Sequence, residues 1–223
     1  MANTSDLKNY WLNRGKGYQE EFARHDRAQR VKFRRQEKGL IEFLKNKTNF
    51  ESVFELGCGF GRITKLLLNE FPDIGRYTAV DLSPDQIANA RKYVSNDKVE
   101  FAVSSGQDLN YPSDSYDLVF ASEVLMHIPP TDIRNVVASM VRISRKHIVN
   151  LDWYHEIQGY EVGGYCFNHD YQSIYKECSC KVEYEEIRRP AIYTMQFSRE
   201  FLISVSKTSA ERQRIWHALK GSS

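Results

Sequence analysis

The residues best suited to chemistry follow the ends of the predicted strands. Glycines alternate with other residues in Gly57-Cys-Gly59-Phe-Gly61, and glycine lets the backbone approach a ligand closely. A helix beginning here offers unpaired N–H groups to an anion. Asp81 follows the next predicted strand, where its carboxylate can accept hydrogen bonds from both hydroxyls of a ribose. Asp108 follows a third strand and can accept from an adenine amino group, with Leu109 near the ring.

Each of these features also has a structural alternative. Tight strand-to-helix turns use glycine without binding a ligand, and Asp81 can be an ordinary acid at a helix start. Ser83 already suits the capping role, however, with Pro84 in the first turn and Gln86 completing a capping box. The glycines lack the Gly-Lys-Ser/Thr ending of a P-loop and depart from the G-x-G-x-x-G of nicotinamide-binding loops. The order of the glycine turn, Asp81 and Asp108 along the chain favours a ligand with a ribose and an adenine.

Candidate bases lie after the fourth and fifth predicted strands. His127 precedes Ile128-Pro129-Pro130 and either accepts a proton or orders this turn. His169 and Asp170 are a second candidate, because a neighbouring carboxylate raises the basicity of an imidazole. Asp170 can equally cap a helix. His155 and Glu156, which follow the fifth predicted strand, are a third candidate.

Two further segments have an unusual composition. Residues 153–175 are rich in aromatic side chains and broken by glycines, so they suit either a lid over an acceptor pocket or a satellite core. We expect a substrate lid over 151–180, in which Trp153, Tyr154, His155 and Phe167 contact the acceptor. Seven basic and two acidic residues lie between Arg24 and Lys38, which is typical of a solvated helix face or of a site for an anionic acceptor.

Strands and helices alternate from residue 51 onward. The expected strands are 52–56, 76–80, 99–103, 116–121 and 147–151, followed by strand-like segments at 181–185 and 201–205. This alternation predicts a parallel sheet covered by helices on both faces. The last two segments predict a hairpin at the sheet edge, and Thr208 with Glu211 can start a short final helix. Residues 1–48 are expected to form a helical arm, and 49–223 a single domain.

The composition excludes several classes of protein. The chain has 223 residues, of which 41% are hydrophobic and 27% charged, so it can bury a real core. It contains no apolar run of the ~18–20 residues that a membrane helix needs, and its start has no signal-peptide pattern. A net charge of +2 does not by itself indicate nucleic-acid binding. The four cysteines have no standard zinc spacing, so we expect no metal. Because they are few and irregularly placed, we also expect reduced thiols and a cytoplasmic protein. We expect a monomer or a homodimer.

Four sequence blocks resemble class I S-adenosylmethionine-dependent methyltransferases. They are Glu55-Leu-Gly-Cys-Gly-Phe-Gly61, Asp81-Leu82-Ser83, Asp108-Leu109 and Tyr116-Asp-Leu-Val-Phe-Ala-Ser-Glu-Val-Leu-Met-His127. The resemblance covers about residues 50–150, and the blocks occur in the order of the family. It implies a doubly wound α/β fold with a mostly parallel seven-stranded sheet, whose last strand is antiparallel. It is not specific for the substrate.

The resemblance also implies how S-adenosylmethionine is bound, with S-adenosylhomocysteine as the product. Glu55, where the family also has aspartate, lies beneath the methionine part, and the turn Gly57, Cys58, Gly59 and Gly61 approaches it. Asp81 binds the ribose, Leu82 packs on the adenine, and Asp108 and Leu109 meet the adenine edge. Ser122 faces the methionine amino group. Arg14 and Tyr18 cover the cofactor from the N-terminal side, with Arg14 near the methionine carboxylate.

These observations predict a methyltransferase acting on a hydroxyl or amine of a small molecule, such as a sugar, an amino acid or a natural-product intermediate. The alternative is an RNA or protein methyltransferase that uses the basic N-terminal helix. A third reading is a binding protein that keeps the fold without turnover, against which the complete set of cofactor residues argues.

Overall fold

The computed structural model describes residues 4–154, 161–162, 165–187 and 199–206. The main helices are α1 (Thr4–Gly15), α2 (Tyr18–Ala23), α3 (Arg27–Lys47), α4 (Arg62–Glu70), α5 (Pro84–Val94), α6 (Ile133–Ile143) and α7 (Tyr171–Glu177). The strands are β1 (Ser52–Leu56), β2 (Arg76–Asp81), β3 (Val99–Val103), β4 (Tyr116–Ser122), β5 (Ser144–Tyr154), β6 (Glu161–Val162), β7 (Cys166–Phe167), β8 (Lys181–Ile187) and β9 (Arg199–Ser206). A short 3₁₀ turn, η1 (Leu125–His127), follows β4.

The large sheet has the strand order β3-β2-β1-β4-β5-β9-β8. Strands β3, β2, β1, β4 and β5 pair in parallel, and β9 pairs antiparallel with both β5 and β8. All five residues of β1 are buried, as expected for a central strand with helices on both faces. The prediction of a parallel, helix-covered α/β sheet is confirmed.

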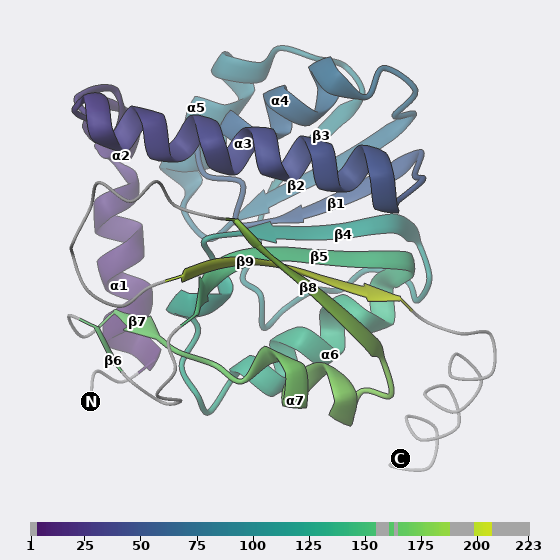
Figure 1. Ribbon diagram of the computed structural model, residues 1–223. Helices are drawn as coiled ribbons and strands as arrows, with labels where there is room; N and C mark the ends of the chain where they lie inside the picture. The colour runs from purple at the N-terminus through teal and green to yellow at the C-terminus, as the bar shows by residue number, and fades with distance from the viewer. Residues whose placement is uncertain (1–3, 155–160, 163–164, 188–198, 207–223) are drawn as a thin grey trace.

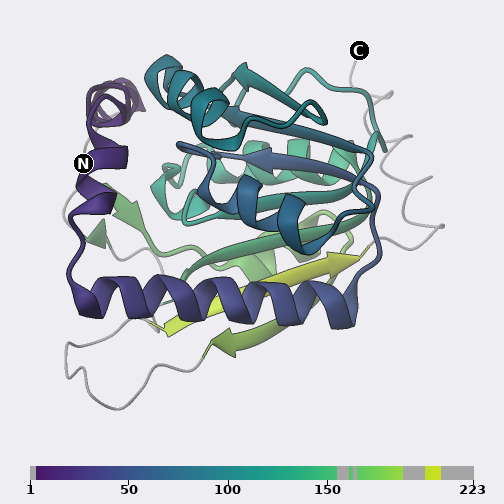
Figure 2. The same ribbon diagram turned by 90° about the horizontal axis from the view of Figure 1, so that it is seen from above.

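Helices cover both faces of this sheet (Figures 1 and 2). On one face, α3, α4 and α5 pack over a core that includes Leu40 and Leu44 of α3. On the other face, α6 and α7 pack over a second core that includes Tyr171 and Tyr175. The second half of α3 is therefore part of the domain core, although the expected arm extends to residue 48.

Helix α1 stands at one end of the sheet, beside the ends of β1, β2 and β4 (Figure 1). Its last residue is so close to the start of α5 that a Cβ at Gly15 would lie 2.2 Å from Ser83 Oγ. Ser83 Oγ caps α5 by accepting from the Gln86 N–H, as predicted. The predicted capping box is wrong, because the Ser83 N–H donates to Asp81, and Gln86 Oε1 has no hydrogen-bond partner among the described residues.

Candidate functional site

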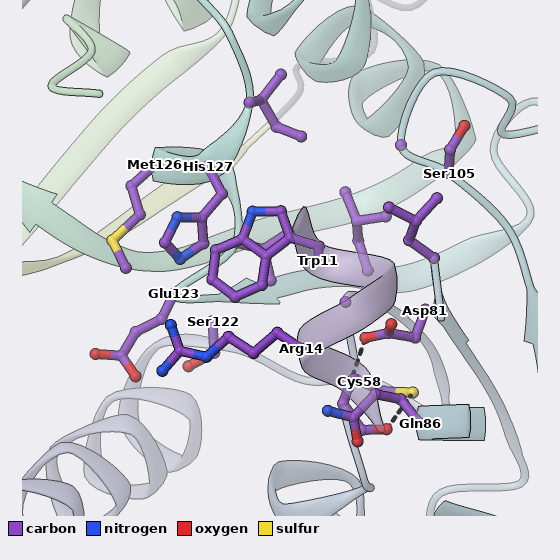
Figure 3. Close-up of a pocket in the computed structure, with 18 of the residues that line it drawn as sticks. Trp11, Arg14, Cys58, Asp81, Gln86, Ser105, Ser122, Glu123, Met126 and His127 are labelled. Atoms are coloured by element: carbon purple, nitrogen blue, oxygen red, sulfur yellow. Dashed lines mark hydrogen bonds between the residues drawn. The ribbon is translucent and has the colours of Figure 1, made fainter. Parts of the chain in front are cut away.

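A cavity of about 500 Å³ lies where the carboxyl ends of β1, β2 and β4 meet α1 (Figure 3). This is the edge of an open α/β sheet at which ligands bind, and the volume is in the range of small-molecule sites, about 300–1,000 Å³. Predicted site residues that line it are Arg14, Tyr18, Glu55, Gly57, Cys58, Gly59, Asp81, Leu82, Ser122 and His127. The structure therefore brings residues from the arm, the glycine turn and the turn after β4 to one cavity.

Glu55 lies at the base of the glycine turn and is almost completely buried. Its Oε2 accepts hydrogen bonds from Thr64 Oγ1 of α4 and from Tyr77 OH of β2, the latter over 2.7 Å. Burial raises the pKa of Glu55 to about 7, although both hydrogen bonds act in the opposite direction. The carboxyl group thus links β1, β2 and α4 beneath the turn. Gly61 is the N-cap of α4 and is not among the residues that line the cavity.

Asp81 occupies the end of β2 at the wall of the cavity. Its two carboxylate oxygens accept from the Gly59 N–H and the Ser83 N–H, each over 2.9 Å (Figure 3). These bonds fix the carboxylate between the glycine turn and the start of α5. Gln86 of α5 also lines the cavity, and its buried Oε1 has no partner in the part of the chain that the structure describes. A buried acceptor of this kind is satisfied when a ligand donor or a water reaches it.

Asp108 and Leu109 do not reach this cavity. Asp108 Oδ2 accepts from Ser105 Oγ over 2.8 Å, and Leu109 packs in the core beneath α6. The cavity wall is formed instead by the preceding residues, 104–107. The sequence pointed to the loop that lines the cavity, but spacing alone does not determine which of its side chains point inward.

His127 lies on the cavity wall opposite Asp81 (Figure 3). Its Nδ1 is 2.8 Å from the carbonyl oxygen of Tyr165, so Nδ1 must carry a proton and donate to that oxygen. The other ring nitrogen, Nε2, then keeps its lone pair. Burial lowers the pKa of His127 to about 4, which leaves the ring neutral at physiological pH. The geometry is that of a histidine able to accept a proton at Nε2.

The other predicted catalytic pair does not join this site. His169 is buried and its Nε2 donates to the carbonyl oxygen of Ile128 over 2.9 Å. Asp170 is exposed and caps α7 by accepting from the Ser173 N–H over 3.0 Å. The alternative of helix capping by Asp170 is therefore the one observed. Neither residue lines the cavity.

The expected acceptor-binding residues have different placements. Phe167 is buried next to His169, their ring centroids being 6.2 Å apart, and does not line the cavity. Trp153 and Tyr154 end β5, and nothing is described of their side chains; His155 and the proposed final helix lie outside the described residues. From the expected lid, Cys166 reaches the cavity, whereas α7 belongs to the core.

The N-terminal arm closes one side of the cavity. Tyr10 stacks on Tyr165 with ring centroids 3.7 Å apart, and the Trp11 ring lies 4.2 Å from that of His127. Arg14 reaches the cavity, but its guanidinium donates to Tyr10 OH and to Glu21, over 2.8 and 2.6 Å. Tyr18 lies beside the glycine turn, with its ring 6.3 Å from that of Phe60.

Glu123 is a cavity residue to which sequence reasoning gave no role. It adopts a left-handed backbone conformation with φ of 54°, and its Oε1 accepts from Lys32 Nζ and Gln36 Nε2, each over 3.2 Å. Burial alone would raise the pKa of Glu123, but Lys32 and Gln36 bring it below its usual value. Its partners lie far away in the sequence on α3, so no local pattern indicates them.

The parallel sheet and the cavity at its carboxyl edge define a Rossmann-like α/β protein. A family model described as "Methyltransferase domain" matches residues 53–147. Malonyl-[acyl-carrier protein] O-methyltransferase of Acetivibrio thermocellus is 39% identical over 70 residues, or 31% of this chain and 24% of that protein. Trans-aconitate 2-methyltransferase of Escherichia coli O1:K1 / APEC is 37% identical over 82 residues, or 36% of this chain and 31% of that protein.

A longer match extends beyond the family segment. Phosphoethanolamine N-methyltransferase 3 of Arabidopsis thaliana is 25% identical over 195 residues, or 85% of this chain and 36% of that protein. The matched parts of these three relatives thus span only 24% to 36% of their own lengths.

Solved structures share the fold. The magnesium protoporphyrin IX methyltransferase of Synechocystis PCC 6803, with bound SAH, superimposes with a TM-score of 0.70 at 13% identity, over 92% of this chain and all of that one. The phosphoethanolamine N-methyltransferase 2 of Haemonchus contortus gives a TM-score of 0.64 at 14% identity, over 78% of this chain and 53% of that one. The resemblance to class I S-adenosylmethionine-dependent methyltransferases found in the sequence is thus confirmed over residues 53–147, and the solved structures share the fold of the chain.

Proposed function

We propose that the protein is an enzyme that transfers a methyl group from S-adenosylmethionine to a hydroxyl or amine of a small molecule, leaving S-adenosylhomocysteine. The observation that carries this proposal is the cavity itself, in which Asp81 and His127 lie on opposite walls. The relatives' names include carboxylate, amine and carrier-bound acceptors, so they support the reaction type and leave the acceptor open.

The residues present fit this cofactor. Asp81 has the acceptor oxygens for a ribose, and the buried Gln86 Oε1 is an acceptor without a partner in the described part of the chain. The start of α4 has no side-chain cap, so its N–H groups suit the methionine carboxylate. In this proposal Glu55 supports the turn from below, Leu82 contacts the adenine, Ser122 meets the methionine amino group, and Arg14 and Tyr18 close the N-terminal side.

Bound S-adenosylmethionine supplies an electrophilic methyl group on a positively charged sulfur. The chain's own task is to align the acceptor and to receive its proton. Alignment is an effective contribution, because positioned groups react with effective molarities of up to ~10⁵–10⁸ M. His127 Nε2 accepts the proton of a hydroxyl or amine as the new bond to carbon forms. Trp11 and the arm exclude water from His127.

A labelled-donor experiment tests this function. The purified protein is incubated with S-adenosylmethionine labelled in the methyl group and with a metabolite extract, and His127→Ala serves as the matched control. We expect a labelled small product with the wild-type protein. Label found only in protein or RNA would reject a small acceptor and support the macromolecular alternative.

The RNA or protein alternative has one observation in its favour. Exposed arginines gather on α3, namely Arg27, Arg30, Arg34 and Arg35. Among the described residues, Arg34 and Arg35 have no acidic partner, in contrast to Lys32 and Lys38. A row of exposed guanidinium groups is able to bind phosphates, and the same row is also typical of a solvated helix face.

A further inference from the structure

The turn that carries His127 has little regular structure of its own. It begins at Glu123, whose backbone is left-handed, and contains the single 3₁₀ turn η1 before Ile128. We propose that Asp152 and His169 are positioning residues that hold this turn so that His127 Nε2 points at the acceptor. The inference rests on the proposed function, because it assigns a task to residues that act through His127.

Asp152 holds the turn from β5. It is almost completely buried, and its Oδ1 accepts from the backbone N–H of Met126, the residue before His127, over 3.2 Å. Its Oδ2 accepts from Asn150 Nδ2 over 3.1 Å. Asn150 Oδ1 in turn accepts from Tyr175 OH of α7 over 3.0 Å. A chain of buried hydrogen bonds therefore runs from α7 through β5 to the turn of His127.

His169 holds the same turn from the other side. Its Nε2 donates to the carbonyl oxygen of Ile128, the residue after His127, over 2.9 Å. The imidazole is buried, with 5% of the residue exposed, so it does not exchange this partner for water. His127 thus lies between two backbone groups that are each fixed by a buried side chain.

The His127 ring is fixed from the segment that leads to His169. The Tyr165 carbonyl accepts from Nδ1, and Cys166 Sγ lies 3.5 Å from the same nitrogen. The short stretch from Tyr165 to His169 therefore contacts both the ring and the backbone of the turn. Displacing His169 would release the Ile128 carbonyl and move Tyr165 relative to Nδ1, so that the proton would no longer be confined to one nitrogen.

Nuclear magnetic resonance of ¹⁵N-labelled histidines tests this inference without an acceptor. In the wild-type protein His127 should be protonated at Nδ1 alone, and His169 should carry a proton on Nε2. In His169→Leu we expect His127 to populate both neutral tautomers. His169→Gln, whose amide can donate to the Ile128 carbonyl, should restore the single tautomer. His147→Gln, in β5 and outside this network, is the matched control and should leave the spectrum of His127 unchanged.

Two results would overturn the inference. One is a folded His169→Leu protein in which His127 remains a single Nδ1–H tautomer. The other is a wild-type protein in which His169 Nε2 carries no proton, and this result decides the matter even if His169→Leu does not fold.

Activity separates this inference from the proposed function. Once an acceptor is identified, His169→Leu and Asp152→Ala should each lower kcat about 10-fold or more. KM and the affinity for S-adenosylhomocysteine should stay near their wild-type values. If His127→Ala kept full turnover, the role of His127 as a base would fail, whereas the tautomer of His127 would still report whether His169 positions it.

Discussion

Gly57 of the glycine turn lies directly against Val124 of the turn that carries His127. A Cβ at Gly57 would be 2.3 Å from Val124 Cγ2, and the glycine has φ of 71°. The glycine turn and the turn that carries His127 are thus in van der Waals contact at the cavity, and the proposed function places the cofactor at the first and the acceptor at the second. Displacing one of these turns displaces the other, so substitutions here affect both halves of the site.

Gly57→Ala is expected to impair the protein through this contact. The new methyl group would push on Val124 and would also force an L residue into a left-handed conformation, which costs on the order of 1–3 kcal/mol. We expect lower affinity for S-adenosylmethionine together with a lower melting temperature, measured by calorimetry. In Gly57→Ala/Val124→Ala the two contacts shorter than 3.0 Å are removed, while the Cβ of residue 124 stays 3.2 Å away, and part of the affinity should return. Wild-type affinity in the single variant would contradict the contact.

His127→Ala should reduce turnover without weakening cofactor binding. Loss of a general base typically lowers kcat by about 10²–10⁴-fold. Burial lowers the pKa of His127 to about 4, so its protonation should not limit activity above about pH 5. The measurement is a pH profile of kcat/KM for the wild-type protein and the variant. An activity that rises through pH 6 to 7 and disappears in His127→Ala would show that the ring titrates near its ordinary value.

Asp152 should make stability depend on pH. Burial raises the pKa of its carboxyl group to about 8, whereas an unfolded aspartate titrates near about 3.9. The folded state therefore binds more protons between these values, and the stabilisation present below about pH 4 is lost as the pH rises towards 8. We expect the free energy of unfolding to fall with pH more steeply in the wild-type protein than in Asp152→Asn. Equal slopes in denaturant titrations would contradict the raised pKa.

Reversing charges on α3 should distinguish the two candidate acceptor classes. Arg34 and Arg35 are exposed and lie outside the cavity, so Arg34→Glu/Arg35→Glu should not change methylation of a small acceptor. For an RNA acceptor, the same change would weaken binding and flatten its salt dependence. The measurement is tRNA binding at low and high salt. Tight, salt-sensitive binding that the double variant loses would favour the RNA alternative.

The sheet and the part of the cavity wall around the glycine turn are largely predictable from the sequence. Continuous apolar runs such as 52–56 mark buried parallel strands, and the glycines with Asp81 mark the turn and wall between them. The direction of individual side chains was not predictable, since Asp108 binds Ser105 instead of facing the cavity. Residues joined only by tertiary packing were missed as well, as with Glu123 and its partners on α3.

The catalytic candidates show the same limit. His127 ends the short turn after β4, so its position at the cavity could be inferred from the strand end. His169 and Asp170 are adjacent in sequence, yet His169 is buried against the Ile128 carbonyl whereas Asp170 is exposed and caps α7. Adjacency in the sequence does not predict these different directions of the two side chains, because the directions depend on where α7 begins.

Titration calorimetry with S-adenosylmethionine tests the central claim most directly, with Asp81→Ala at the end of β2 and Asp85→Ala, at an exposed position in the first turn of α5, as matched variants. We predict one binding site per chain in the wild-type protein and in Asp85→Ala. Asp81→Ala should lose about 1–3 kcal/mol of binding free energy because the ribose contacts are removed. Unchanged affinity in a folded Asp81→Ala protein would contradict the ribose assignment. A wild-type protein that binds a nicotinamide dinucleotide and gives no heat with S-adenosylmethionine would contradict the whole account.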